Sequence, residues 1–109
     1  IIARKLDDAT VDDLRKTIDI LMKSAKEMAI VLGTAQDGRV TIVVAISPGL
    51  VKRGLHAGDV SKEVAKLVGG GGGGRPDMAQ AGGQWVDKLD EALRFAIELL
   101  SKKILGGIS

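Results

Sequence analysis

The chain has 109 residues, enough for one domain around a single hydrophobic core. Charged residues make up 28% of it, and the formal net charge of +2 is too small to indicate nucleic acid on its own. It contains no cysteine, which excludes disulfides, thiolate metal sites and cysteine nucleophiles.

No apolar stretch approaches the ~20 residues that cross a bilayer, and no signal-peptide pattern stands at the start, so no membrane partner is expected. The chain begins at Ile1 inside an apolar run, which predicts a fragment cut from a longer protein. Its only aromatic residues are Trp85 and Phe95, so the core is expected to be aliphatic. Their scarcity also argues against RNA readers that stack successive bases on aromatic platforms.

The first 28 residues predict a strand followed by a helix. Ile1 to Lys5 is short and starts with β-branched residues, which is typical of a strand entering a sheet. Thr10 is a suitable N-cap, and Asp13 can complete a capping box. Helical spacing then predicts a helix to about Met28, whose buried stripe consists of Val11, Leu14, Ile18, Leu21, Met22 and Ala25.

Residues 29–35 and 40–46 are near-continuous apolar runs rich in Val and Ile, as in strands. Asp37-Gly38 lies between them, and because glycine accepts the positive φ of a tight turn, this step predicts a hairpin. The runs lack polar alternation, so both faces of the sheet are expected to be largely covered.

Two more helices are predicted beyond a short helical turn through Lys52. One runs from about His56 to Val68, with Gly69 as its C-terminal cap. The other begins near Val86 and buries Leu89, Leu93, Ala96, Ile97, Leu100 and Ile104. The sequence thus predicts an α/β (α+β) domain, in which a mixed β-sheet with the Asp-Gly hairpin packs against three main helices.

Positive charge gathers in the middle of the chain. Residues 39–75 contain six basic and two acidic residues, whereas the rest contains ten basic and twelve acidic residues. This clustering fits a nucleic-acid surface, and it also fits ordinary solvated helix faces.

Six consecutive glycines, residues 69–74, precede Arg75 and Pro76. Each glycine costs roughly 0.5–1 kcal/mol of extra chain entropy when it becomes ordered, so one interpretation is a flexible linker. The other is that a second backbone or a phosphate approaches this main chain, with Arg75 beside it. A Walker loop would need Lys and then Ser or Thr in place of Arg75-Pro76, and a dinucleotide fingerprint would need a preceding strand. Neither ATP nor NAD is therefore indicated.

The string GGGGGGRPDMAQAGG, with Gly54-Leu55-His56-Ala57-Gly58 upstream, resembles the signature of the C-terminal domains of alanyl-tRNA synthetases. These belong to the DHH-associated domain family, which also occurs beside DHH phosphoesterase domains. The resemblance extends over essentially the whole chain. The glycine motif is highly specific, and the remaining elements are less so.

This resemblance implies that residues 1–109 form a single non-catalytic, tRNA-binding domain of a longer alanine–tRNA ligase. Such a domain holds the outer corner of tRNA, here expected to be the tRNA for alanine, and couples aminoacylation with editing. Its other partners are domains of the same synthetase and, in some members, a second copy in a homodimer. The expected compartment is the cytoplasm. ATP, Mg and Zn are expected only in the missing parts of the parent, and no cofactor here.

The RNA-binding candidates come from two sources. The family motif supplies the glycines and the arginine, namely Gly69, Gly70, Gly71, Gly72, Gly73, Gly74 and Arg75. The charge pattern alone adds Lys52, Arg53, Lys62 and Lys66.

Two other functions stay open on the sequence. One is the accessory, substrate-binding domain of a DHH phosphoesterase, although that kind tends to carry a shorter glycine motif followed by histidine, where Arg75 stands here. The other is an oligomerisation module that uses the final helix and Phe95.

Single residues give little sign of catalysis. His56, the only histidine, is expected to serve in packing or capping, and Ser47 and Ser61 lie in no nucleophile motif. No catalytic or metal-binding residue is therefore predicted. Trp85 is expected to anchor the entrance of the last helix in the core, with an exposed or RNA-stacking role as the alternative. Met78 is expected to fill the core.

Overall fold

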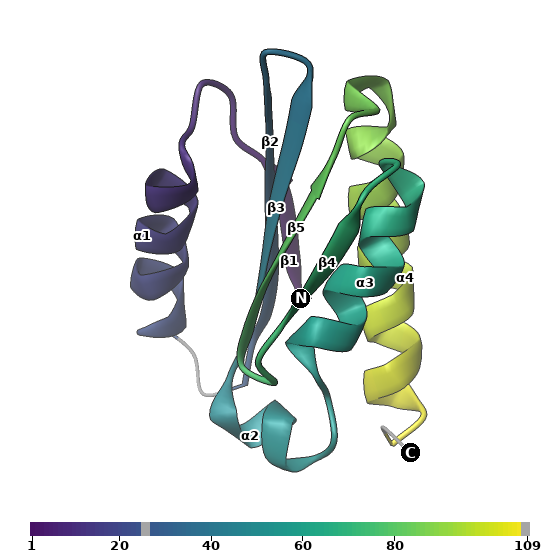
Figure 1. Ribbon diagram of the computed structural model, residues 1–109. Helices are drawn as coiled ribbons and strands as arrows, with labels where there is room; N and C mark the ends of the chain where they lie inside the picture. Colours follow the sequence, from purple (N-terminus) through teal and green to yellow (C-terminus); the bar gives the residue numbers. More distant parts are fainter. Residues whose placement is uncertain (25–26, 108–109) are drawn as a thin grey trace.

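A computed structural model describes residues 1–24 and 27–107, which form a five-stranded mixed sheet in the order β1-β2-β3-β5-β4 (Figure 1). Strand β1 (Ile2–Lys5) pairs parallel with β2 (Ala29–Gln36), and all other neighbours are antiparallel. The remaining strands are β3 (Arg39–Ile46), β5 (Met78–Gly83) and, at the edge, β4 (Gly71–Gly74). The predicted mixed sheet is confirmed.

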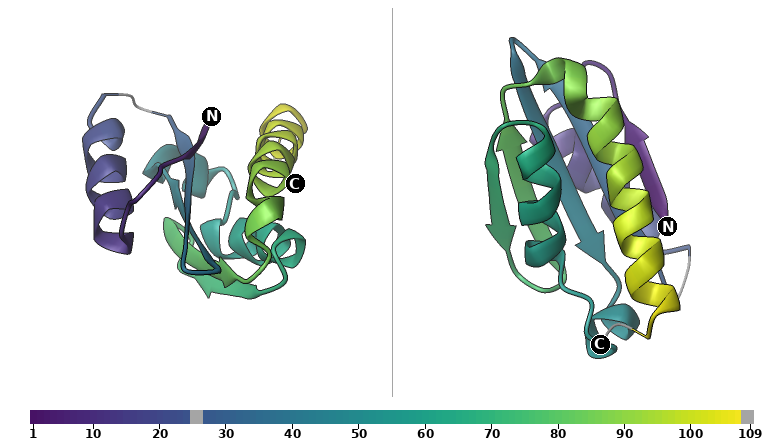
Figure 2. Two further views of the ribbon diagram at one scale, coloured as in Figure 1. Left: turned by 90° about the horizontal axis from the view of Figure 1, so that it is seen from above. Right: turned by 90° about the vertical axis from the view of Figure 1, so that its right-hand side faces the viewer.

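Helices cover both faces of this sheet. Helix α1 (Val11–Met22) lies on one face, whereas α3 (Ala57–Leu67) and α4 (Leu89–Leu105) lie side by side on the other (Figure 2). The short α2 (Pro48–Lys52) stands at one end of the sheet, and a 3-10 turn, η1 (Val86–Lys88), leads into α4. The three long helices agree with the prediction. None of the helices in the described part of the chain is both long and apolar enough to cross a membrane.

The central strands supply two separate cores because their residues alternate between the faces. Val40, Ile42 and Val44 of β3 are buried against α3 and α4, whereas Val43 and Ala45 are buried against α1. A strand covered on both faces has no need of polar residues, which explains the continuous apolar runs.

The N-terminus of α1 has the predicted capping box. The Asp13 N–H donates to Thr10 Oγ1 at 3.1 Å, and the Thr10 N–H donates to Asp13 Oδ2 at 2.9 Å. The backbone hydrogen bond from Thr10, together with that from its side chain, lowers the pKa of Asp13 below its ordinary value of 3.8. The cap thereby satisfies donors that a helix start leaves without partners.

The predicted end of this helix near Met28 is wrong. The helix ends at Met22, and Met28 instead exchanges hydrogen bonds with Ser47, to whose Oγ its N–H donates at 2.9 Å. This tertiary contact draws Met28 towards the sheet. Ala25, part of the predicted stripe, lies outside the described residues.

The turn between β2 and β3 consists of Asp37 and Gly38, with φ of 51° and 75°. Gln36 and Arg39 face each other across it, and the pairing continues to Ala29 and Ile46. Positive φ at both central residues matches the right-handed twist of the strands that they join.

Helix α4 begins three residues later than Val86, and Ile104 of its predicted inner face is only half-buried. Leu89, Leu93, Ala96 and Leu100 are buried as expected, but Ile97 is 40% exposed. At about 100° per residue, Ile97 stands roughly 80° from Leu89 around the helix, outside the face that contacts the sheet.

Candidate nucleic-acid interface

The glycine run forms an ordered strand, so its interpretation as a flexible linker is wrong. Gly71 to Gly74 make up β4 at the edge of the sheet, and they pair antiparallel with Gly82 to Ala79 of β5. Pairing with β5 and packing against α3 offset the entropy that four ordered glycines lose. This leaves the second interpretation, in which another part of the molecule or a ligand approaches the bare backbone.

The approaching backbone is that of α3. A Cβ on Gly72 would lie only 2.8 Å from the Ser61 carbonyl oxygen, and one on Gly58 would lie 2.7 Å from the Gly74 carbonyl oxygen. Ser61 is fully buried at this contact, and its hydroxyl donates to the Gly58 carbonyl at 2.9 Å. Helix and strand therefore pack main chain against main chain, which only glycine permits.

Not every glycine in β4 faces the helix. Nothing lies within 4 Å of the place where a Cβ on Gly71 would stand, and a Cβ on Gly73 would meet only the Lys62 Cε, at 3.7 Å. Gly71 and Gly73 share the sheet face of their cross-strand neighbours Gly82 and Gln80. This open face of β4 is the part of the run that an external group can approach.

The N-terminus of α3, a second place where an anion could bind, is closed by the protein itself. The Ala57 N–H donates to the Pro76 carbonyl at 2.8 Å, and the Gly58 N–H donates to the Arg75 carbonyl at 3.2 Å. The Asp59 N–H donates to His56 Nδ1 at 3.2 Å. The donors that would hold a phosphate at a helix start are thus occupied.

This geometry assigns His56 its role. Because Nδ1 accepts from the Asp59 N–H, the imidazole acts as the N-cap of α3. This agrees with the prediction of a capping role for His56. Asp59 Oδ1 lies 3.9 Å from the same nitrogen, but a nitrogen that accepts that hydrogen bond carries no proton to share with the carboxylate. We therefore take the cap, and not an ion pair, as the interaction.

Arg75 lies in the turn between β4 and β5, where its backbone closes the hairpin through an N–H bond to the Met78 carbonyl at 2.9 Å. Its side chain is 75% exposed, and its Nε lies 3.5 Å from Asp77 Oδ1. Exposed ion pairs of this kind contribute about 0–1 kcal/mol, so a phosphate could displace the carboxylate at little cost.

The four residues selected by charge fall into two groups. Lys62 and Lys66 stand one turn apart on α3, and the Lys62 Cε lies close to Gly73 of β4. Lys52 and Arg53 lie at α2, at the end of the sheet where the Arg75 turn also lies (Figure 1). Lys66 pairs with Glu63, and Arg53 pairs with Glu27, both at 3.4 Å between exposed atoms.

Two arginines near the open face are missing from the sequence-based candidates. Arg15 of α1 reaches β5, donating to Gln80 Oε1 at 3.4 Å and contacting Met78 Sδ at 3.6 Å. Arg39 starts β3 and lines a hollow beside Gly82. Arg39 belongs to the basic segment 39–75, but only the antiparallel pairing of β3 with β5 brings it close to the glycines. Nothing in the sequence indicates the contact of Arg15.

Trp85 corrects another prediction. It is 50% exposed instead of buried in the core, and its ring covers Gly69, where a Cβ would lie 2.6 Å from the ring carbon Cδ2. Gly69 has a φ of +70°, a conformation suited to glycine. Gly69 is the residue after the C-cap of α3, and the Gly70 N–H closes the helix end on the Ala65 carbonyl at 3.0 Å.

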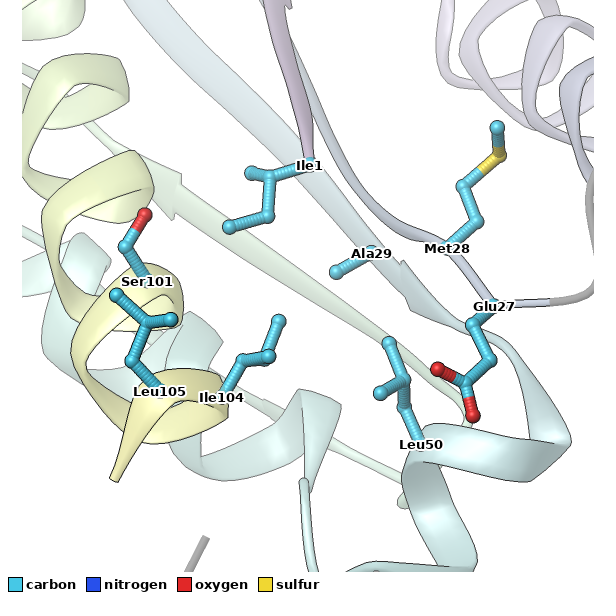
Figure 3. A pocket seen from close by; sticks show the side chains of 8 residues that line it. All are labelled: Ile1, Glu27, Met28, Ala29, Leu50, Ser101, Ile104 and Leu105. Atoms are coloured by element: carbon cyan, nitrogen blue, oxygen red, sulfur yellow. The ribbon is translucent and has the colours of Figure 1, made fainter. Parts of the chain in front are cut away.

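An apolar hollow of about 340 Å³ lies elsewhere, between α2 and the C-terminal end of α4 (Figure 3). The side chains of Ile1, Leu50 and Leu105 face it, and Glu27 stands on its rim. Among the described residues, those that line it include no lysine or arginine. Its residues from the final helix, Ser101, Ile104 and Leu105, belong to the helix that the oligomerisation alternative uses, but Phe95 does not line the hollow.

Comparison with known proteins identifies the fold. Residues 1–102 match the family model described as the DHHA1 domain. The chain belongs to the DHHA1 domain family. The match includes the whole of β4, Arg75 and the helix that packs against them, so the resemblance inferred from the glycine motif is confirmed.

This DHHA1 domain is similar to parts of alanine–tRNA ligases. It is 48% identical over 98 residues to the enzyme of Halalkalibacterium halodurans, which covers 90% of the chain and 11% of the relative. It is 53% identical over 94 residues to that of Desulfitobacterium hafniense, covering 85% of the chain and 10% of the relative. The chain thus spans about a tenth of the length of the curated relatives it matches.

A solved structure shows the same likeness in three dimensions. The C-Ala domain from Aquifex aeolicus alanyl-tRNA synthetase is 30% identical to the chain, with a TM-score of 0.82. The alignment covers 92% of this chain and 90% of that one. The likeness therefore extends over nearly the whole of both chains.

Proposed function

We propose that this DHHA1 domain is a non-catalytic tRNA-binding module of an alanyl-tRNA synthetase, of which residues 1–109 form one part. The observation that carries the proposal is the likeness to the C-Ala domain over nearly the full length of both chains. In this role the domain holds the outer corner of tRNA, so that one tRNA stays within reach of aminoacylation and editing. ATP, Mg and Zn then belong to other parts of the synthetase, in the cytoplasm.

The interface we propose consists of the Arg75 turn, the open face of β4 and the lysines of α3. Arg75 offers a planar fork of donors with three-quarters of its side chain exposed, which suits a phosphate oxygen. Lys62 adds a point charge along the same edge. Lys52 and Arg53 extend the positive surface at the end of the sheet. Such a surface recognises the shape and backbone of folded RNA more than its sequence.

The non-catalytic part of the proposal is supported by the state of two groups able to act as a base or nucleophile. The Nδ1 lone pair of His56 is occupied by the Asp59 N–H. The Ser61 hydroxyl is fully buried and donates to Gly58. Among residues 1–24 and 27–107, acidic residues and His56 do not gather into groups of three that could hold a metal ion.

The test is fluorescence anisotropy of end-labelled tRNA for alanine, titrated with the purified chain at two salt concentrations. We expect binding that weakens with salt by a slope of a few phosphates and that an RNA duplex of equal length fails to compete. The absence of binding up to high micromolar protein would overturn the proposal.

The same preparation separates the alternatives. A dimer in sedimentation that ignores tRNA would indicate an assembly role based on the final helix and Phe95. Metal-dependent phosphodiesterase activity of the full-length protein would indicate the phosphoesterase context. Neither outcome is expected if tRNA binding is the function.

A further inference from the structure

Trp85 is held in a fixed position at the surface, at the end of the glycine run opposite to Arg75. Its N–H and that of Gln84 both donate to the Val68 carbonyl, at 3.0 and 2.9 Å. Its ring rests on Gly69, and half of its surface remains exposed. A large aromatic ring that is both exposed and fixed provides a flat surface for a ligand with little further loss of entropy.

A polar hollow of about 490 Å³ lies at the same end of the glycine run. Gly69, on which the ring rests, also lines the hollow, together with the backbone of Gly82 and Gly83. Its other lining residues are Arg39, Val40, Thr41 and Gln84, so none of the lining residues is acidic. Arg39 has no carboxylate within ion-pair distance in the described part of the chain. The hollow therefore combines a free cation with amide, hydroxyl and bare peptide groups.

We propose that Trp85 and this hollow bind a nucleobase of folded RNA together with its adjacent phosphate. The base stacks on the exposed indole, the Arg39 guanidinium pairs with the phosphate, and Gln84 and Thr41 offer hydrogen bonds to the base or the ribose. This inference rests on the proposed function. It adds a second contact between the domain and RNA. From the sequence, an RNA-stacking role is given only to Trp85, and only as an alternative.

The position of this contact fits a single RNA that touches both ends of the run. Gly69 and Arg75 are six residues apart with the extended β4 between them, so they lie at most roughly 20 Å apart at 3.3 Å per residue. A folded RNA is large enough to cover that distance. The base contact would fix the orientation of the RNA, while the lysines and Arg75 supply salt-dependent attraction.

The experiment uses Trp85 as its own reporter, because the chain has one tryptophan and no tyrosine. Indole emission and its quenching by acrylamide are measured during titration with unlabelled tRNA, in parallel with anisotropy of labelled tRNA. Arg39→Gln is compared with Arg4→Gln, which removes the same charge from an exposed residue of β1. Trp85→Phe and Trp85→Ala are compared after urea titration has shown that each is folded.

We expect bound tRNA to quench Trp85 and protect it from acrylamide. Loss of the stacking surface in Trp85→Ala should weaken binding on the order of 10-fold, with Trp85→Phe recovering much of it. Arg39→Gln should weaken binding more than Arg4→Gln does.

Three results would overturn the inference, and they have different meanings. If tRNA binds but Trp85 emission and acrylamide access are unchanged, the hollow is not a contact and the proposed function stands. If no tRNA binds, both fail. If Trp85 emission depends on protein concentration without tRNA, this surface joins copies of the chain instead.

Discussion

Because only one face of β4 packs against α3, we expect alanine substitutions at two adjacent glycines to have opposite effects on stability. Gly71→Ala places a methyl group in open space, whereas Gly72→Ala places one 2.8 Å from the Ser61 carbonyl oxygen and 3.0 Å from the Ala81 Cβ. Both changes are chemically identical and occur in one edge strand. Only the face differs.

The magnitude follows from what has to move. Cβ atoms in real proteins essentially never approach another atom within 3.0 Å, and the Ser61 oxygen belongs to the backbone of α3, so the helix must shift. Overpacking of this kind costs about 1–3 kcal/mol. Gly71→Ala reduces the entropy of the unfolded chain instead, which stabilises by about 0.4–1 kcal/mol where no strain results. We expect the two variants to differ by about 2–3 kcal/mol, or roughly 10 °C in Tm for a domain of this size.

Urea denaturation followed by far-ultraviolet circular dichroism measures this difference. Gly73→Ala is a second control, since its methyl group would meet only the flexible end of Lys62 at 3.7 Å. Its midpoint should resemble that of Gly71→Ala. Equal midpoints for Gly71→Ala and Gly72→Ala would refute the conclusion that the contact with α3 is what requires glycine in β4.

Three further predictions concern caps and charge. The lowered pKa of Asp13 means that its contribution to stability is present above the unfolded pKa near 3.8 and is lost as pH falls through the folded value. Urea midpoints should therefore fall more between pH 5 and 2.5 in the parent than in Asp13→Asn, and parallel curves would contradict this. His56→Ala should destabilise by about 1 kcal/mol through loss of the α3 cap, and His56→Asn should retain most of the stability, since asparagine also caps. Equal losses in these two variants would argue against capping. Arg75→Ala should weaken tRNA binding and lower the salt slope by about one, with the urea midpoint unchanged; an unaltered salt slope would remove Arg75 from the interface.

Local sequence signals account for much of the fold. Apolar runs and helical periodicity predict the central strands and the three long helices, because each depends on neighbours within a few residues. The end of α1 fails at Met28, where the hydrogen bonds to Ser47 come from 19 residues away. The prediction that Ile97 is buried is wrong for a related reason, because apolar spacing alone does not show how wide a stripe of the helix the sheet covers.

Strands β4 and β5 have no such signal. Gly71 to Gly74 contain no side chains whose alternation could indicate a strand, and β5 is mostly Ala, Gly and Gln. Their pairing is decided by long-range contacts, above all the backbone of α3 against Gly72. The family motif marks the glycines of β4 as functional residues. It does not indicate that Gly72 and Gly74 are required by packing within the domain.

The N–H groups at the N-terminus of α3 already have partners within the protein, and this limits where an anion can contact the backbone of the glycine run. A glycine run next to a helix start suggests that phosphate binds at the helix dipole, but Arg75 and Pro76 direct their carbonyl oxygens at those N–H groups. Any backbone contact with RNA would then be made at the open side of β4, at Gly71 and Gly73, with the Arg75 side chain at one end. A methyl group on Gly71 would obstruct that approach without touching α3. If RNA uses this face, Gly71→Ala loses tRNA affinity while it keeps or gains stability, and that combination separates binding from packing within a single strand.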